Sequence, residues 1–483
     1  MPVGDTNLFF NRDTKVYAVQ YTGSATANVW ELPVLNGYSF SQSTNASQVT
    51  VNEMASATGN SRRGQASFND SLAPAEWSFD MYARPTLDTN VRAPEEVLWH
   101  SMFAETVMYP AAGTGTGLGF GTGAAWAAGV VTLTFTTAAP TGGTYFKVGD
   151  TITVSGVTYT GSNPAVNTGP NDFVVTATSA TTVSYAAPAG TTGVTASSGS
   201  VASATFSSSS TQLDFLTKSS NKTRLGTFDL YFVLGAAKAG GTADTYTASD
   251  ATTIYKVANC CVNEATANFD IDGITTISFS GMGTRISEMA SWTFTGAVQN
   301  PDQAASVTHT LFKTGTTSTT NMIRNRLTSL SIVGTNPGIN DGSAKTYGVT
   351  LTGGSITISN NMTFLTPEAI GVVNVPLGHV TGTRSVSGNF TCYADELTNG
   401  SIDLYQDLIG ATSLITNSHA LQFSVGGPSG TGSPTVQFTL GQCHLEVPTI
   451  NIDDIIGFEV NFTALPSTIS GTNELTRIRY IPQ

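Results

Sequence analysis

Hydrophobic and polar residues alternate with a period of two along much of the chain, as in Phe458–Phe462 and Ile277–Ser280. This alternation buries one face of a strand and leaves the other in water, so it predicts antiparallel sheets. Two stretches depart from it and predict helices, at Glu96–Ala104 and Ile402–Gly410. Before the first of these, Pro94 suits the opening turn of a helix.

The order of the predicted elements occurs twice. Asn11–Thr14 and Asn325–Thr328 share the pattern Asn-Arg-x-Thr, and a predicted strand follows each, at Val16–Val19 and Leu330–Val333. Further matches follow in the same order, which predicts an internal duplication. They are Tyr38–Ser41 with Ile356–Ser359, Trp77–Ala83 with Gly388–Ala394, the two predicted helices, and Phe269–Ile274 with Asn451–Ile455.

The duplication divides the chain into two copies. We expect copy 1 at residues 1–110 and 206–299, a linker at 300–321, and copy 2 at 322–483. Copy 1 is interrupted by a Gly-rich linker at 111–127, whose composition cannot bury a core, and by an inserted β module at 128–205. Predicted strands of the module are Val130–Phe135, Thr151–Val157, Asp172–Thr178 and Thr182–Ala186.

Charged residues make up 11% of the chain and hydrophobic residues 40%, so neutral polar side chains must cover much of the surface. Such a surface suits extensive protein contact. The formal net charge is -13, and Arg62-Arg63 is the longest run of basic residues. This balance argues against binding nucleic acid by phosphate neutralisation. It suits a conduit along which DNA slides, and it equally suits simple solubility.

Motifs that would carry chemistry are missing from the sequence. There is no His-Glu-x-x-His, Gly-x-Ser-x-Gly or Walker loop, and the five histidines are scattered, so we expect no metal, cofactor or enzymatic activity. A hydrolase using Asp453 and Asp454 is the weaker alternative, because adjacent strand residues point to opposite faces. The four cysteines, Cys260, Cys261, Cys392 and Cys443, lack paired spacing and are expected to be buried free thiols. No signal peptide or membrane-spanning apolar run is seen.

The order of strand, long polar hairpin, aromatic strand, helix and closing strands, present twice, resembles the tail tube (major tail) proteins of long non-contractile phage tails. It is similar to the subgroup in which one chain carries two tube domains. The resemblance covers about residues 10–110, 206–295 and 322–465. It implies a mostly β fold with two tandem tube domains of sandwich or barrel type, each with one packed helix. The insertion resembles the small Ig-like β-sandwiches of phage virion proteins.

The resemblance implies a structural virion protein of the phage tail, assembled in the host cytoplasm without membrane insertion. Three chains would form a pseudo-sixfold ring, and stacked rings would form the tube through which DNA is ejected. Tape-measure, tail terminator and tail tip proteins would be its partners, and double-stranded DNA would pass without specific binding.

Two long polar hairpin segments, Ser41–Ser67 and Asn360–Gly382, would then be arms that reach the adjacent ring. Solvated loop positions are the alternative interpretation of their charged residues. The candidate contacts are Gln48, Asn52, Glu53, Arg62 and Arg63 in the first arm, and Glu368, His379 and Arg384 in or just beyond the second.

A second hypothesis makes the protein a virion-surface adhesin. The inserted module would then recognise a host glycan through exposed aromatic residues, with Tyr145, Tyr159 and Tyr185 as candidates. The module could equally stabilise the outside of a tube.

Overall fold

In a computed structural model, the chain divides into two compact units. The first unit comprises Met1–Arg84, Ala93–Thr106 and Phe215–Arg479. The second unit comprises Pro85–Arg92, Val107–Asp214 and Tyr480–Gln483. The first holds most of both copies and the second the inserted module. The structure describes residues 8–22, 24–49, 66–87, 91–103, 120–127, 130–135, 151–152, 173–178, 182–186, 213–216, 225–236, 244–248, 250–299, 306–313, 322–334, 345–367, 374–410, 419–426, 434–452, 454–466, 474–475 and 477–481.

Copy 1 is built on an antiparallel sheet whose strands lie in the order β1-β15-β17-β18-β6-β3. Buried and less buried residues alternate strictly along β6 and β18, whereas β1 and β15 are buried along nearly their whole length. The bounds are β1 (Lys15–Tyr21), β3 (Ser39–Ser41), β6 (Ala75–Tyr82), β15 (Phe228–Leu234), β17 (Thr253–Phe269) and β18 (Thr276–Gly283), with the 3-10 turn η2 (Asn11–Asp13) before them and helix α1 (Glu96–Phe103) after β6.

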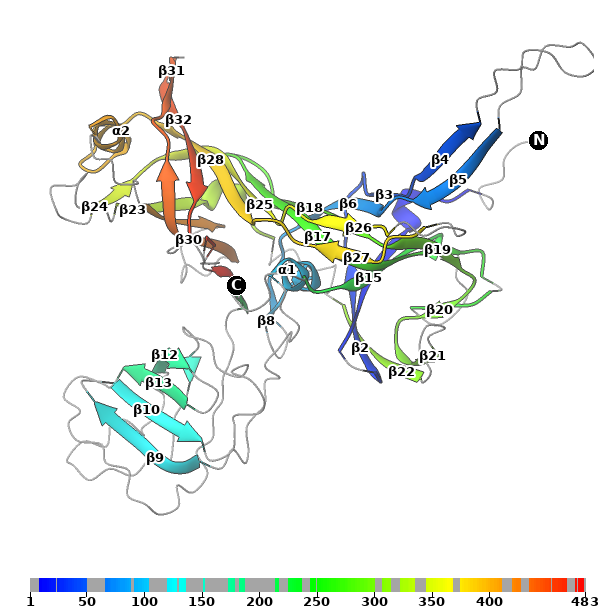
Figure 1. The fold of residues 1–483 in the computed structure, drawn as a ribbon. Helices are drawn as coiled ribbons and strands as arrows, with labels where there is room; N and C mark the ends of the chain where they lie inside the picture. Colours follow the sequence, from blue (N-terminus) through cyan, green and yellow to red (C-terminus); the bar gives the residue numbers. More distant parts are fainter. Residues whose placement is uncertain are drawn as a thin grey trace, which may run out of the picture. The chain divides into compact units, whose positions relative to one another are not determined.

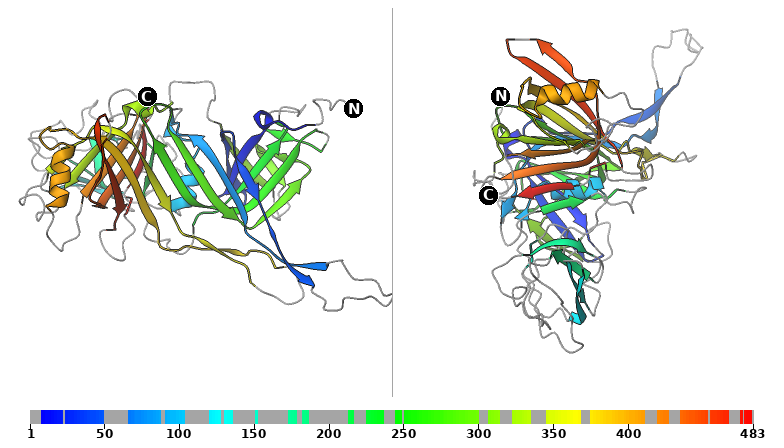
Figure 2. Two further views of the ribbon diagram at one scale, coloured as in Figure 1. Left: turned by 90° about the horizontal axis from the view of Figure 1, so that it is seen from above. Right: turned by 90° about the vertical axis from the view of Figure 1, so that its left-hand side faces the viewer.

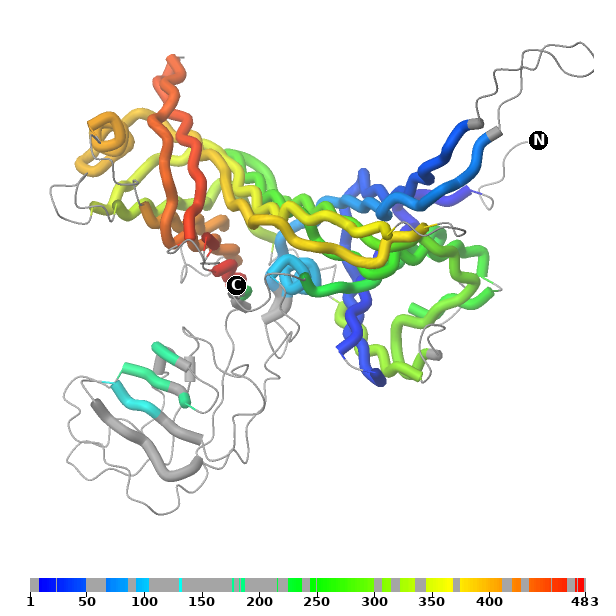
Figure 3. Tube along the Cα trace, in the orientation of Figure 1, coloured from blue at the N-terminus to red at the C-terminus, as the bar shows by residue number. Residues whose placement is uncertain are grey.

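Copy 2 has the same topology, in the order β23-β29-β30-β32-β28-β25. Figure 3 follows the chain from copy 1, blue to green, into copy 2, yellow-green to red. The bounds are β23 (Ser329–Gly334), β25 (Leu351–Ser359), β28 (Ser385–Tyr393), β29 (His419–Val425), β30 (Thr435–Leu445) and β32 (Ile456–Ala464), with the 3-10 turn η5 (Asn325–Leu327) and helix α2 (Ser401–Ile409) at the matching places. β31 (Thr449–Ile452) continues β30 as a partner of β32.

The strand register corrects one match of the sequence alignment. If Phe79 corresponds to Phe390, then Ser39, which pairs with Ser78, corresponds to Ser355, which pairs with Asn389. The alignment by eye placed Tyr38–Ser41 opposite Ile356–Ser359, two residues too far along. A shift of two keeps the alternation of faces, so periodicity alone could not detect the error.

A pair of glycines supports the duplication from the backbone side. Gly235 follows β15 with φ +75°, and Gly426 follows β29 with φ +102°, a region that favours glycine. A Cβ at Gly235 would lie 2.9 Å from the ring of Phe9, and one at Gly426 would lie 2.9 Å from Ile323. Phe9 and Ile323 each stand two residues before the repeated Asn-Arg pair, so the copies share this close packing.

The helices begin and end within a residue of the predicted bounds, but they differ in environment. All eight residues of α1 are buried, and Trp99 packs edge-on against Phe279 of β18, with ring centroids 5.1 Å apart. Glu96 is held in the core because its carboxylate accepts from the Trp30 indole N–H and the Ala93 backbone N–H, both at 3.0 Å. In contrast, α2 buries one side, where Leu404 and Leu408 lie.

Two segments predicted to be linkers contain strands. Within 300–321, β22 (Ser306–Phe312) pairs with β21 (Gly296–Gln299) and, in parallel, with β2 (Thr26–Leu32). Within 111–127, β9 (Phe120–Ala127) pairs with β10 (Val130–Phe135) in the second unit. Backbone pairing there overrides a composition rich in small residues. The module's other strands are β11 (Thr151–Ile152), β12 (Phe173–Thr178) and β13 (Thr182–Ala186).

The remaining described strands are short or lie at the edges of the two copies. They are β4 (Thr44–Val49), β5 (Ala66–Leu72), β7 (Thr86–Leu87), β8 (Val91–Arg92), β14 (Leu213–Leu216), β16 (Thr245–Tyr246), β19 (Arg285–Met289), β20 (Trp292–Thr293), β24 (Lys345–Gly348), β26 (Thr363–Leu365), β27 (Gly378–Val380) and β33 (Arg477–Ile481).

Candidate lumen face and assembly edges

The two copies are joined by strand pairing into one sheet. The second half of β17, in copy 1, pairs antiparallel with β25, the edge strand of the copy 2 sheet, from Glu264 opposite Ser359 to Phe269 opposite Gly354. Midway, the hydroxyl oxygens of Thr266 and Thr357 lie 3.1 Å apart. The strand order β32-β28-β25-β17-β18-β6-β3 therefore runs from copy 2 into copy 1 without a break; these strands are labelled in Figure 1.

One face of this joined sheet is apolar and buried, and the other is polar. Phe279 and Phe390 are buried on the first face, which carries the aromatic core. The other face presents Ser, Thr and Asn side chains together with carboxylates. No Lys or Arg occurs in β3, β6, β18, β25, β28, β31 or β32, or in the second half of β17. The carboxylates of the polar face are Glu76, Asp80, Glu264 and Glu459.

A second contact between the copies surrounds the turn η5. The side chain of Asn325 donates to Asp270 Oδ1 at 3.0 Å and accepts from Thr275 Oγ1 at 2.7 Å, so the tip of the β17–β18 hairpin holds the start of copy 2. Backbone bonds reinforce this contact, since Thr275 N–H donates to Ile323 O at 3.0 Å. Asn325 and Ile323 are both buried.

The second arm packs on copy 1 of its own chain. Arg384 Nε donates to Asn360 Oδ1 at 3.1 Å, and Asn360 Nδ2 donates to Met102 O at the end of α1 at 3.1 Å. The guanidinium of Arg384 also lies over the Phe103 ring, 5.5 Å from its centroid. Burial lowers the pKa of Arg384, with Glu474 opposing that shift. Arg384 therefore joins the two copies in the structure of one chain.

His379 makes the same kind of internal contact. It lies in β27, which pairs with β26, and its Nε2 accepts from Leu225 N–H at 2.9 Å. Its Nδ1 lies 3.1 Å from Cys261 Sγ, and burial raises the pKa of that thiol well above its usual range. Met362 and Phe364 complete a small apolar cluster here with Leu225 and Cys261. His379 therefore makes an internal contact in the single chain, and the contact of this arm with an adjacent ring stays a prediction.

The first arm is exposed where it is described. Strands β4 and β5 pair as a two-stranded ribbon, on which Gln48 is exposed and Phe68 is 65% exposed. Its base touches the second arm, because Leu72 N–H donates to Asn374 O at 2.8 Å (Figure 2, left). The other predicted arm contacts, Asn52, Glu53, Arg62, Arg63 and Glu368, lie outside the described residues.

The strands that correspond to the two junction strands in the other copy, β31 and β3, carry exposed residues. β31 pairs with β32, and its Ile450 and Ile452 are 42% and 80% exposed. β3 pairs with β6, and its Ser39 and Ser41 are exposed. Sequence reasoning read β31 as a closing strand and missed this edge. The signal was present in the duplication, since the matching positions of copy 1 meet copy 2.

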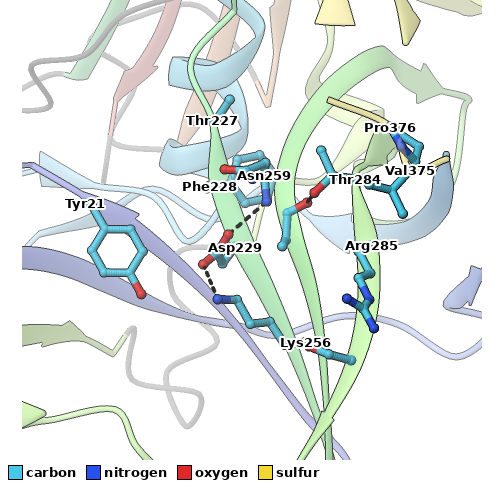
Figure 4. A pocket seen from close by; sticks show the side chains of 12 residues that line it. Tyr21, Thr227, Phe228, Asp229, Lys256, Asn259, Thr284, Arg285, Val375 and Pro376 are labelled. Carbon is cyan, nitrogen blue, oxygen red and sulfur yellow. Dashed lines mark hydrogen bonds and ion pairs between the residues drawn. The ribbon is translucent and has the colours of Figure 1, made fainter. Parts of the chain in front are cut away.

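A pocket of about 640 Å³ lies on copy 1 (Figure 4). Its base holds a buried ion pair in which Lys256 Nζ lies 3.1 Å from Asp229 Oδ2, and the backbone N–H of Asn259 donates to Asp229 Oδ1 at 2.9 Å. Because the carboxylate is already paired and hydrogen-bonded, this arrangement stabilises the sheet rather than supplying a base. Arg285 of β19 and, from the second arm, Pro376 also line the pocket.

The described residues hold neither a cluster of His, Cys, Asp and Glu able to bind a metal ion nor a helix long and apolar enough to span a membrane. All four cysteines are free and buried, as predicted. In the inserted module, Tyr185 is fully buried, which corrects the expectation of an exposed ring, because this face of β13 packs inward. Tyr145 and Tyr159 lie outside the described residues, as does Asp453.

The mostly β fold is consistent with the phage tail tube class that the sequence resembles. No protein-family model matches the sequence. Among characterised proteins, however, the chain is similar to a phage tail tube protein, which confirms the resemblance inferred from the sequence. The relative is tail tube protein pb6 of Escherichia phage T5, which is 26% identical over 469 residues that cover 96% of this chain and 74% of that protein.

Proposed function

We propose that this protein is a structural subunit of a phage tail tube, in which chains close into rings and rings stack into a hollow tube for DNA ejection. The observation that carries the proposal is the β17–β25 pairing, which joins two domains of the same topology into one sheet. A sheet that adds like domains edge to edge has the geometry of a growing barrel wall. The similarity to a tail tube protein supports this reading.

The proposed ring contains three chains, each supplying two tube domains, for pseudo-sixfold symmetry. A ring closed by repeated edge pairing leaves no free strand edge, which protects the subunits from irregular association. Contacts between the faces of successive rings are head-to-tail, so they propagate as a filament. The tape-measure, terminator and tail tip proteins are the partners such a tube requires, and the tail of the virion is its location.

The polar sheet face is proposed to line the lumen. Its carboxylates Glu76, Asp80, Glu264 and Glu459 would repel phosphates, and the strands of that face contribute no cation to hold them. Each Lys or Arg bound to a phosphate releases counterions and anchors DNA, so a wall without them lets a duplex slide. The adhesin alternative is not favoured, because Tyr185 cannot offer its ring to a glycan while buried.

The test is assembly of the purified protein, followed by negative-stain electron microscopy and light scattering before and after concentration. Rings with threefold or pseudo-sixfold end views, and tubes built from them, are expected. Particles that remain single chains at every concentration, with or without added tail tip proteins, would refute the proposal. Ile452→Asp, at the exposed edge of β31, should abolish rings, whereas Leu397→Asp, an exposed residue before α2, should leave ring formation intact.

A further inference from the structure

We propose that the junction between chains repeats the junction within the chain, residue for residue. In this junction, β31 of one chain pairs with β3 of a second chain. This inference rests on the proposed ring and specifies how it closes. Its basis is a correspondence between the two copies. β31 has in copy 2 the place that the second half of β17 has in copy 1, and β3 has in copy 1 the place that β25 has in copy 2.

The place of β31 follows from its pairing with β32. Because Phe79 corresponds to Phe390, the residues that pair with them, Phe279 and Val460, also correspond. Counting from these, Ser278 corresponds to Glu459. Their partners on the next strand are Thr266 and Thr449, so Thr449 takes the place of Thr266.

The place of β3 follows from its pairing with β6. Ser39 corresponds to Ser355, and therefore Ser41 corresponds to Thr357. Within the chain, Thr266 lies opposite Thr357. The register between chains is then fixed: it sets Thr449 opposite Ser41, Ile450 opposite Phe40, Asn451 opposite Ser39, and Ile452 opposite Tyr38.

Burial supports this register. At the internal junction Ala267 and Ile356 lie opposite each other and both are buried, whereas their counterparts Ile450 and Phe40 are exposed or only partly buried. The internal pair Phe269 and Gly354 sets a large side chain against none. The proposed pair sets Ile452, which is 80% exposed in the single chain, against the ring of Tyr38, so pairing would bring two apolar side chains together.

The surroundings of η2 give independent support. Asn325 of η5 is buried by the β17–β18 hairpin, while its counterpart Asn11 of η2 is exposed and its side chain donates to Asn36 Oδ1 at 2.9 Å. Ile323 is fully buried, whereas its counterpart Phe9 is 47% exposed. Pairing of β31 with β3 brings the β31–β32 hairpin of one chain to η2 of the next, where it would cover both residues.

The first arm extends the same correspondence. Phe68 stands as far before Phe79 as His379 stands before Phe390. His379 packs into the apolar cluster at Cys261 of copy 1, but Phe68 is exposed in the single chain. We therefore place Phe68 against copy 2 of the neighbouring chain. An exposed phenylalanine on a two-stranded ribbon needs such a cover, since a ribbon of this kind is marginal alone.

The test is disulfide cross-linking in the assembled full-length protein. Ser41→Cys with Thr449→Cys should join chains under mild oxidation, because directly opposite side chains on one face lie close enough for a disulfide. Non-reducing electrophoresis should show covalent dimers and trimers, with trimers as the limit for a closed ring of three. The matched internal pair, Thr266→Cys with Thr357→Cys, should form its bond within one chain and give no dimer.

A slipped pair decides the register. Ser41→Cys with Ile450→Cys places the thiols on opposite faces and should cross-link at least tenfold more slowly. Microscopy of each variant before oxidation separates the two proposals. Rings that form but cross-link only through the slipped pair, or through neither pair, would overturn the register and leave the tube function standing. Failure of the unmodified protein to form rings would overturn the function itself.

Discussion

His419 gives the fold a defined sensitivity to acid. It begins β29, and none of its surface is exposed. Burial lowers its pKa from 6.5 to about 4, while the charge of Asp407 raises it and that of His444 lowers it. The neutral ring is therefore the form that the folded core accepts.

The sign of the effect follows from which state takes up the proton first. As the pH falls, the unfolded chain binds it near the ordinary histidine pKa, well before the folded chain does. The contribution of the neutral ring is thus complete above that value and is lost as the pH falls toward about 4. Between about pH 7.5 and about pH 5 the linkage relation gives a loss of about 2 kcal/mol in the free energy of unfolding.

The assay is urea unfolding of the unassembled chain at both pH values, followed by tryptophan fluorescence and circular dichroism. His419→Leu, which keeps an apolar side chain of similar size, should remove most of the pH dependence attributable to this group. His444→Gln serves as the control for replacing a histidine on a neighbouring strand and should retain that dependence. A His419→Leu variant that loses as much stability as the parent between the two pH values would show that the buried ring is not its source.

Two further variants test the sheet and the ion pair. The Cβ of Gly388→Ala would meet Ser355 O, so we expect a loss of about 1–3 kcal/mol in the free energy of unfolding. Gly348→Ala has open space around its Cβ and should be neutral. Urea midpoints of the two variants compare them, and equal midpoints would contradict the close packing at Gly388. Asp229→Leu leaves Lys256 buried without its partner and should cost about 3–5 kcal/mol. The double variant with Lys256→Met should recover most of that loss by calorimetry, and no recovery would place the cost elsewhere.

Periodicity and order identified most of the architecture in advance. The repeated Asn-Arg turn, the aromatic strand and the helices all lie where the sequence predicted them, because local patterns encode local elements. The alignment of the β3 segment with the β25 segment was wrong by two residues, because a shift of two leaves the alternation of faces unchanged. Strands β9 and β22 were taken for linkers, because pairing with a distant strand leaves no mark in composition.

The candidate interface was harder to predict than the fold. His379 and Arg384 were chosen because they lie in or just beyond the second polar hairpin segment, and in the single chain both make contacts between its two copies. Ile450 and Ile452 are exposed because no strand pairs with β31 on that side among the described residues. The sequence of one segment does not show which strand will lie beside it. Comparing one copy with the other supplies that information, because the copies solve the same packing problem in two different settings.

The β17–β25 pairing also changes the thermodynamics of assembly. Its two strands belong to one polypeptide, so they meet at an effective concentration set by the chain and not by the amount of protein in solution. In the proposed ring, half of the junctions form during folding, and half as many molecules must collide to close it. Ring formation then follows a lower power of subunit concentration, and tube growth becomes less sensitive to dilution early in expression.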